Sequence, residues 1–297
     1  MAELDAATVR AWLPPRLEDG HKGTFGHLFV LAGSRGFTGA AKLTCMAAYR
    51  SGVGLVTLGV PHPLADAVAA GLLETMSLPL PATETETFSE AAVPPAMAFA
   101  ASKEAVVLGP GLSRHPETTR FVHACVERCP VPLLVDADGL NALSEAVHVL
   151  EAKSAPCVVT PHPGEMARLA GVTTRAVQED REGAAAHFAK RYDCVVVLKG
   201  RRSVIAAPDG ALYVNPTGNS GLGTGGTGDV LSGVIGGLLA QRVAPFEAAC
   251  LGVYVHGLAG DIAAARRTAR GMIASDVIQA IPDAWRAVED ERLESRD

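Results

Sequence analysis

The sequence lacks the features of a nucleic-acid-binding, secreted or membrane-spanning protein. Its net charge is −6, and Lys and Arg form no cluster beyond Arg201-Arg202 and Arg266-Arg267, so the basic surface expected of a nucleic-acid binder is missing. The N-terminal residues include early acidic side chains and no apolar segment typical of a signal peptide. No stretch approaches the ~18 uninterrupted apolar residues of a transmembrane helix. We therefore expect a cytoplasmic protein without nucleic-acid or membrane partners.

Paired cysteines are also missing. The chain has no CxxC motif, and its six cysteines are scattered through apolar segments. This distribution is typical of reduced thiols in a protein core, and it argues against a disulfide framework or a structural zinc site. The six are Cys45, Cys125, Cys129, Cys157, Cys194 and Cys250.

Short apolar runs alternate along the chain with helical stretches. Hydrophobic residues make up 48% of the 297 residues, and the runs show no strict alternation, as is typical of strands buried on both faces of a parallel sheet. This rhythm predicts an α/β fold with a doubly wound, mostly parallel sheet and helices on both faces, formed by a single domain over residues 1–297. The predicted strands are His27–Ala32, Gly54–Val60, Ala105–Leu108, Pro132–Val135, Cys157–Thr160 and Cys194–Leu198.

Helical patterns fill the segments between the strands, and the end of the chain changes character. Pro208-Asp209-Gly210 is a strong turn signal between two short apolar runs and predicts a β-hairpin, with three helical segments after it from Gly228 onward. The segment from Thr83 to Pro95 resembles a surface loop. The helices predicted between strands are Ala40–Arg50, Pro116–Arg128, Asn141–Ala152, Gly164–Ala170 and Thr174–Tyr192.

The segment from Asn215 to Asp229 is rich in glycine and leads directly into an apolar helix. Glycines at a helix start let backbone N–H groups approach an anion closely, with the positive end of the helix behind them, so phosphate is the expected ligand. Gly221, Gly223 and Gly226 satisfy GxGxxG, but a dinucleotide fold places this motif after the first strand. No P-loop motif occurs in the chain.

Asp229 stands one residue after Gly228, in the first turn of the predicted helix. A carboxylate beside an anion-binding loop is unfavourable for phosphate binding unless it has a task, such as taking the proton of an attacking hydroxyl. The alternative is that Asp229 caps the helix and interacts with its dipole. From the spacing alone, both interpretations stay open.

Four further polar segments follow predicted strands, at the edge where open parallel sheets bind ligands. Each also has a structural interpretation. The Gly109 segment can be a tight turn, and the acidic and amide side chains after Val135 can form turns and caps. His162, between two prolines, can be loop filler or face a ligand, and Lys199 can be solvated. The segments are Gly109–Leu112, Asp136–Asn141, Thr160–Glu165 and Lys199-Gly200, and His162 with Glu165 is not a convincing metal pair.

These motifs together resemble the NAD(P)H-hydrate dehydratases, ribokinase-like proteins often called the YjeF C-terminal domain type. The resemblance covers most of the chain. The Gly225–Asp229 segment indicates only the wider ribokinase group, whereas Thr160–Glu165 combined with Lys22–Phe25 and the Ala32–Ala41 loop indicates the dehydratases more narrowly. Gly223 stands where the family has Ala, and Ser203 ends a segment that commonly ends in Thr. The motifs that carry the resemblance are Lys22–His27, Ala32–Ala41, Arg50–Leu55, Gly109–Gly111, Asp136–Asp138, Thr160–Glu165, Leu198–Gly200, Asn215–Asn219 and Gly225–Asp229.

The resemblance implies two groups of site residues. It associates Ala41, Gly111, His162 and Asp229 with the hydrated dinucleotide, with Asp229 as the catalytic base. It associates Gly228 and a loop near the hairpin with the adenine nucleotide. The loop residues are Lys199, Gly200, Arg201, Arg202 and Ser203. The anion-binding segment consists of Gly225, Gly226, Thr227 and Gly228.

The implied reaction is the dehydration of the S epimer of hydrated NADH or NADPH, driven by phosphoryl transfer from ADP or ATP, with ADP favoured. Mg²⁺ is expected with the nucleotide, but no sequence cluster indicates its ligands. The resemblance also implies a homo-oligomer, such as a tetramer. The chain starts too close to Lys22 for an N-terminal epimerase domain, so a separate epimerase is expected. The alternatives are a kinase for a thiazole alcohol or pyridoxine-like vitamin precursor, and a non-catalytic adenine-nucleotide sensor.

Overall fold

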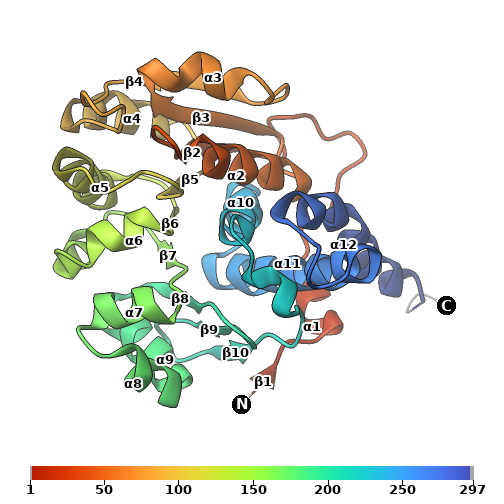
Figure 1. The fold of residues 1–297 in the computed structure, drawn as a ribbon. Coiled ribbons are helices and arrows are strands. Elements are labelled where there is room, and N and C mark those ends of the chain that lie inside the picture. Colours follow the sequence, from red (N-terminus) through yellow and green to blue (C-terminus); the bar gives the residue numbers. More distant parts are fainter. Residues whose placement is uncertain (1, 295–297) are drawn as a thin grey trace.

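A computed structural model describes residues 2–294, and its sheet follows the predicted alternation (Figure 1). Residue 1 and residues 295–297 of the expected domain lie outside the described residues. The strands are β1 Ala2–Glu3, β2 His27–Leu31, β3 Leu55–Pro61, β4 Met76–Leu80, β5 Ala105–Leu108, β6 Leu133–Val135, β7 Cys157–Val159, β8 Val195–Leu198, β9 Val204–Ala206 and β10 Leu212–Val214.

The strands form one ten-stranded sheet in the order β1-β10-β9-β8-β7-β6-β5-β2-β3-β4. Only β9 runs antiparallel to its neighbours, β8 and β10, so the predicted hairpin is confirmed. The chain leaves β2 toward β3 on one side and leaves β5 toward β6 on the other. The connections after β2 and β5 therefore diverge, and open α/β sheets bind ligands outside the carboxyl ends of strands at such a point.

Helices cover both faces of the sheet, as Figure 1 shows. Helices α2, α10, α11 and α12 pack on one face, and α4 to α7 with α9 pack on the other. Strand residues alternate between the two cores: Val107 of β5 faces the first, and Val106 and Leu108 face the second. The helices are α1 Ala6–Ala11, α2 Thr38–Arg50, α3 Ala65–Ala69, α4 Val93–Ala100, α5 Pro116–Arg128, α6 Asp138–Leu143, α7 Pro163–Ala170, α8 Thr174–Glu179, α9 Arg181–Tyr192, α10 Thr227–Ala240, α11 Pro245–Arg267 and α12 Ala274–Glu294.

Two predicted helices are wrong as single elements. The Asn141–Ala152 segment consists of the end of α6 and a separate 3₁₀ helix, Val147–Ala152. The Thr174–Tyr192 segment breaks at Asp180 into α8 and α9. The Asp180 side chain accepts a hydrogen bond from the N–H of Gly183 at 2.8 Å. An Asp that bonds nearby backbone favours a new helix start over a continuous helix, and this capping starts α9 at Arg181.

Some elements were not predicted from the sequence. Strand β4 contains Pro79 and lies at the edge of the sheet, where proline is tolerated but the apolar pattern is weak. The predicted surface loop after Thr83 is partly wrong, because Thr83 and Thr87 are buried and their hydroxyl groups lie 2.8 Å apart.

Helix α11 is long and apolar enough to cross a membrane by length and composition alone. However, 67% of its most apolar window is buried inside the protein, as expected of a helix in a globular core. All six cysteines are buried and free, which confirms the prediction of core thiols.

Candidate active site

The glycine-rich segment starts helix α10 without a side-chain cap. Gly226 is the N-cap residue in a left-handed conformation (φ +92°), and the helix begins at Thr227. The Thr227 hydroxyl donates to the carbonyl oxygens of Leu222 (2.7 Å) and Thr224 (3.0 Å), which fixes the preceding turn. The first N–H groups of a helix have no intrahelical acceptor. The α10 start therefore offers backbone donors where the sequence predicts an anion site, and anion binding there stays a prediction.

A buried ion pair lies beside this helix start. Lys199 Nζ, at the end of β8, donates to Asp136 Oδ1 at 2.7 Å, and Ser232 Oγ on α10 donates to Asp136 Oδ2 at 2.7 Å. The side chain of Asp136 is 1% exposed and that of Lys199 is 19% exposed. Burial alone would raise the pKa of Asp136, but Lys199 and the hydrogen bonds from Lys199 and Ser232 hold it below its usual value. The pair thus connects β6, β8 and α10.

Asp229 lies in the first turn of α10, near this ion pair. Burial and the negative charge of Asp136 raise the pKa of Asp229 to about 7, against the opposing effect of Lys199. Burial likewise raises the pKa of Glu165 to about 6. A carboxyl group with a pKa near neutrality can exchange a proton with a substrate at physiological pH. Asp229 therefore has the properties of a general base, beyond those of a helix-capping residue.

The loop between β8 and β9 and the α10 start line one cavity of about 620 Å³. This volume is within the range of small-molecule sites. His256 on α11 also lines the cavity, and its Nε2 lies 2.9 Å from the Thr227 carbonyl oxygen. Since a carbonyl only accepts, Nε2 carries the proton and Nδ1 is left as an acceptor. The 620 Å³ cavity is also lined by all the residues predicted to bind the nucleotide, namely Lys199, Gly200, Arg201, Arg202, Ser203 and Gly228.

Two predicted residues for the hydrated dinucleotide, Ala41 and Gly111, lie near the carboxyl ends of β2 and β5, and both are buried. Gly111 follows β5 in a left-handed conformation (φ +64°), and a Cβ atom there would lie 2.9 Å from the Cβ of Phe37. The Ser34 hydroxyl donates to the Gly111 carbonyl at 2.7 Å and ties the turn after β2 to the turn after β5. Ala41 is fully buried on α2. Backbone and small side chains form this part of the site.

His162, another predicted residue for the hydrated dinucleotide, is the N-cap residue of α7. Its Nδ1 accepts from the N–H groups of Gly164 (3.0 Å) and Glu165 (3.3 Å), and Glu165 Oε2 accepts from the His162 N–H at 2.8 Å. This reciprocal capping box fixes the ring, whose side chain is 53% exposed. His162 is therefore not loop filler, because it caps α7, and its Nε2, which carries the proton, lies 3.5 Å from Glu165 Oε1.

Two structural interpretations from the sequence are wrong. Lys199 is not solvated, and Asp136 is not a turn former, because the two form the buried pair. Both interpretations fail because the tertiary fold brings the end of β8, with Lys199, beside Asp136 and the start of α10. Asp138 does not cap α6: its side chain accepts from the N–H of Ser113, which follows β5, at 2.8 Å and from Asn141 Nδ2 at 3.1 Å.

The sequence did not indicate that Ser232 binds Asp136, or that Glu165 lies near Lys199. Ser232 lies three residues after Asp229, so both are on one face of α10, and this spacing was the available signal. Glu165 Oε2 lies 3.9 Å from Lys199 Nζ, a proximity that the sequence does not indicate. Among residues 2–294, no group of three or more His, Cys, Asp or Glu side chains is placed to hold a metal ion.

The parallel sheet, the uncapped glycine-rich helix start and the carboxyl group in its first turn define a ribokinase-like α/β protein. The family model for NAD(P)H-hydrate dehydratase matches residues 28–283. The chain therefore belongs to the NAD(P)H-hydrate dehydratase family.

Relatives agree with this assignment. The chain is 46% identical to the bifunctional NAD(P)H-hydrate repair enzyme Nnr of Moorella thermoacetica, over 97% of this chain and 54% of that protein. It is 39% identical to the ADP-dependent (S)-NAD(P)H-hydrate dehydratase of Neisseria meningitidis serogroup B, over 89% of this chain and 86% of that one. The chain thus spans about half the length of the bifunctional relatives.

A solved structure shares the fold over almost the whole chain. It is that of the Bacillus subtilis ADP/ATP-dependent NAD(P)H-hydrate dehydratase, co-crystallised with ATP and Mg²⁺, with a TM-score of 0.82 and 30% identity. The similarity covers 97% of this chain and 99% of that one.

Proposed function

We propose that this chain dehydrates the S epimer of hydrated NADH and NADPH at the expense of ADP or ATP, and so repairs damaged dinucleotides. The observation that carries the proposal is Asp229, a carboxyl group with a pKa of about 7 held beside an uncapped helix start and Lys199. The family assignment supports the substrate. The Neisseria relative is an ADP-dependent enzyme, which favours ADP as the phosphoryl donor.

In the proposed reaction, the hydroxyl oxygen of the substrate attacks the terminal phosphorus of the nucleotide. Asp229 takes the proton of that hydroxyl group during the attack. The bond from that phosphorus to the leaving AMP or ADP breaks. The N–H groups of Gly225 to Gly228 and the charge of Lys199 stabilise the transferring phosphoryl group. The ring nitrogen then expels phosphate, and loss of a ring proton restores the double bond. Phosphorylation is needed because hydroxide is a poor leaving group.

The nucleotide loop and the hydrate residues have separate tasks in this proposal. Lys199 to Ser203 and Gly228 bind the nucleotide, and Ala41, Gly111 and His162 bind the hydrated dinucleotide. In the proposal the two groups of residues meet at Asp229, which follows Gly228 directly in the chain.

Mg²⁺ fits this site as an ion that arrives with the nucleotide. Such ions are held mainly by phosphate oxygens and need only one or two carboxylates from the protein. Asp136 is already bonded to Lys199 and Ser232, and Glu165 Oε2 accepts from the His162 N–H, so the phosphate oxygens would be the main ligands of the ion. When bound, Mg²⁺ neutralises charge on the phosphates.

Three further features stay proposals. We propose a cytoplasmic location, in keeping with six free buried cysteines, and a homo-oligomer such as a tetramer. We also propose cooperation with an epimerase, because the bifunctional relatives join two activities in one chain.

The direct test is to mix the protein with hydrated NADH and either ADP or ATP, and to follow the return of dihydronicotinamide absorbance. We expect absorbance to return with at least one nucleotide and AMP or ADP to form in equal amount. No return with either nucleotide contradicts the proposal. A stable phosphorylated product from a thiazole alcohol or a pyridoxine-like compound would instead favour a vitamin-precursor kinase.

A further inference from the structure

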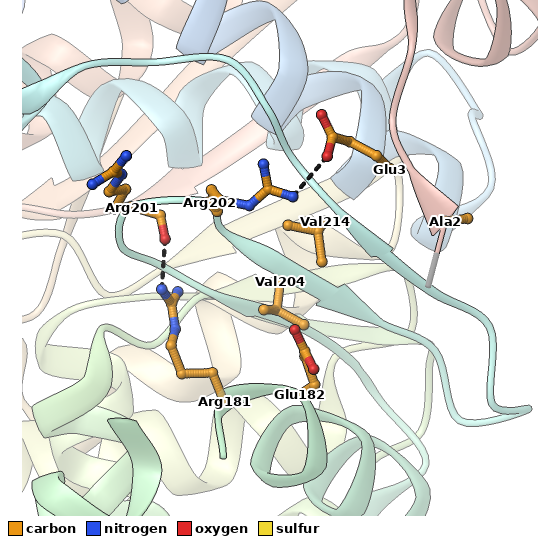
Figure 2. Close-up of a pocket in the computed structure, with 8 residues that line it drawn as sticks. All are labelled: Ala2, Glu3, Arg181, Glu182, Arg201, Arg202, Val204 and Val214. Atoms are coloured by element: carbon orange, nitrogen blue, oxygen red, sulfur yellow. Dashed lines mark hydrogen bonds and ion pairs between the residues drawn. The ribbon is translucent and has the colours of Figure 1, made fainter. Parts of the chain in front are cut away.

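A single guanidinium group holds the loop between β8 and β9. Arg181, the first residue of α9, donates from Nη1 to the Arg201 carbonyl at 2.6 Å. Its Nη2 donates to the carbonyls of Leu198 (3.0 Å) and Lys199 (3.3 Å). Figure 2 shows the Arg181 side chain directed at the backbone oxygen of Arg201, whose own side chain points elsewhere. One side chain thus binds three carbonyl groups within four consecutive residues.

The backbone of this loop is adapted to the guanidinium. Gly200 has φ +146°, and a Cβ atom there would lie 3.0 Å from Arg181 Nη2. Arg202 adopts a left-handed conformation (φ +58°), which non-glycine residues seldom do. Such conformations persist only where the surroundings impose them. Arg181 is partly buried and binds the carbonyl before Gly200 and the carbonyl before Arg202. It therefore helps to impose the conformations of both residues.

The direction of these carbonyls determines where the neighbouring N–H groups point. In a trans peptide bond, the C=O of one residue and the N–H of the next point in opposite directions. The first peptide obeys this rule: the Leu198 carbonyl accepts from Arg181, and the Lys199 N–H donates to the Pro161 carbonyl at 2.8 Å. The N–H groups of Gly200 and Arg202 must likewise point away from Arg181. Neither has a protein acceptor among the described residues.

Two cavities lie beside this loop. Arg181 lines a cavity of about 300 Å³ with Glu3 and Glu182, which Figure 2 shows. The 620 Å³ cavity with the α10 start also includes Gly200 and Arg202, but Arg181 does not line it. The loop thus separates Arg181 from the cavity that we assign to the nucleotide.

We propose that Arg181 is a positioning residue for the nucleotide: by binding three carbonyl groups behind the loop, it presents the N–H groups of Gly200 and Arg202 to oxygen atoms of the bound phosphates. This inference rests on the proposed function. It adds a residue that does not touch the nucleotide and assigns the two N–H groups as anion donors. Backbone N–H groups in succession are effective anion ligands.

The test is to measure ADP binding by calorimetry, without hydrated dinucleotide, for the wild type, Arg181→Ala and Arg181→Lys. We expect Arg181→Ala to weaken ADP binding about 10- to 100-fold, the usual effect of losing hydrogen bonds to a charged group. Lys carries the charge but lacks the planar fork that can bind several carbonyls, so Arg181→Lys should fall between the two. Turnover at saturating ADP should stay within about threefold of wild type, because only ground-state binding is lost.

Arg191→Ala is the matched control, since Arg191 lies on the same helix and forms an exposed ion pair with Glu151 at 2.9 Å. It should bind ADP as the wild type does. Guanidinium ion added to Arg181→Ala should restore part of the affinity. If Arg181→Ala binds ADP with wild-type affinity, or loses turnover at saturating ADP but not affinity, the inference is wrong. If the wild type itself binds no ADP, the proposed function fails instead.

A second measurement does not depend on a variant that folds. In wild-type protein labelled with ¹⁵N glycine and arginine, ADP should shift the amide proton resonances of Gly200 and Arg202 and slow their exchange with solvent. The amide of Gly210, in the exposed turn between β9 and β10, serves as the internal reference. Unchanged Gly200 and Arg202 amides in ADP-saturated protein overturn the inference.

Discussion

The two sides of the candidate site are built from different materials. The proposed nucleotide side, Lys199–Ser203 with Gly228, lies against a buried ion pair and a helix start, and charged groups fix its geometry. The proposed hydrate side, Ala41, Gly111 and His162, consists of small residues, one turn and a capping imidazole. The first should therefore fail when a charge loses its partner, and the second when a side chain fills its space.

The largest expected effect comes from Asp229, where the two sides meet. Asp229→Asn keeps the shape but removes the base, so turnover should fall by about 10²- to 10⁴-fold, the usual contribution of general-base catalysis. ADP affinity should change little or improve, because a negative charge near the phosphates is lost. Single-turnover kinetics and calorimetry measure the two quantities. Normal turnover in this variant would exclude Asp229 as the base.

Asp136→Asn tests the nucleotide side of the site, where charged groups fix the geometry. This change leaves Lys199 as an unpaired, largely buried cation, so the free energy of unfolding should fall by about 3–5 kcal/mol, measured by urea denaturation. The control is Glu179→Gln, which breaks the exposed Arg175–Glu179 pair and should cost less than about 1 kcal/mol. Adding Lys199→Met to Asp136→Asn should restore part of the lost stability. If Asp136→Asn costs no more than Glu179→Gln, the buried pair contributes nothing beyond an exposed one.

The hydrate side is tested by Gly111→Ala, whose new methyl group would meet Phe37. We expect the KM for hydrated NADH to rise about tenfold, equivalent to about 1.4 kcal/mol, with ADP affinity unchanged. Gly36→Ala is a close control, because Gly36 also has a positive φ (+85°) but no atom within 4 Å of the added Cβ. Similar KM values for the two variants would mean that backbone strain, and not the filled space, causes the effect.

The smallest predicted effects concern pH. A base with a pKa of about 7 should make kcat/KM fall up to tenfold per pH unit below 7, a slope absent in Asp229→Asn. The folded-state pKa lies above the unfolded value of 3.8, so the folded state binds more protons between the two, and stability falls as pH rises from about 4 to 7. Asp229→Asn should therefore be more stable than wild type at pH 8, by on the order of 1 kcal/mol or more, with no gain near pH 4. Thermal unfolding at both pH values decides this.

Local sequence predicted the parts of the fold that depend on local patterns. The six predicted strands and the hairpin at Pro208–Gly210 are present, because apolar runs and turn residues act within a few residues. The break at Asp180 was missed, since an Asp can either stay exposed in a helix or cap the next one. Strand β4, an edge strand with a proline, carried too weak a pattern to be found.

The sequence by itself determined the α/β rhythm, the glycine-rich helix start and the place of Asp229 in the first turn of α10, all properties of neighbouring residues. Only the tertiary structure decided that Asp136, Ser232 and Lys199 meet in one buried network, and that Arg181 binds the loop after β8. Contacts between residues 63 or 96 positions apart depend on how the strands pair and the helices pack. The pKa of Asp229 depends on the same packing, because burial and the charges brought beside a carboxyl group set its proton affinity.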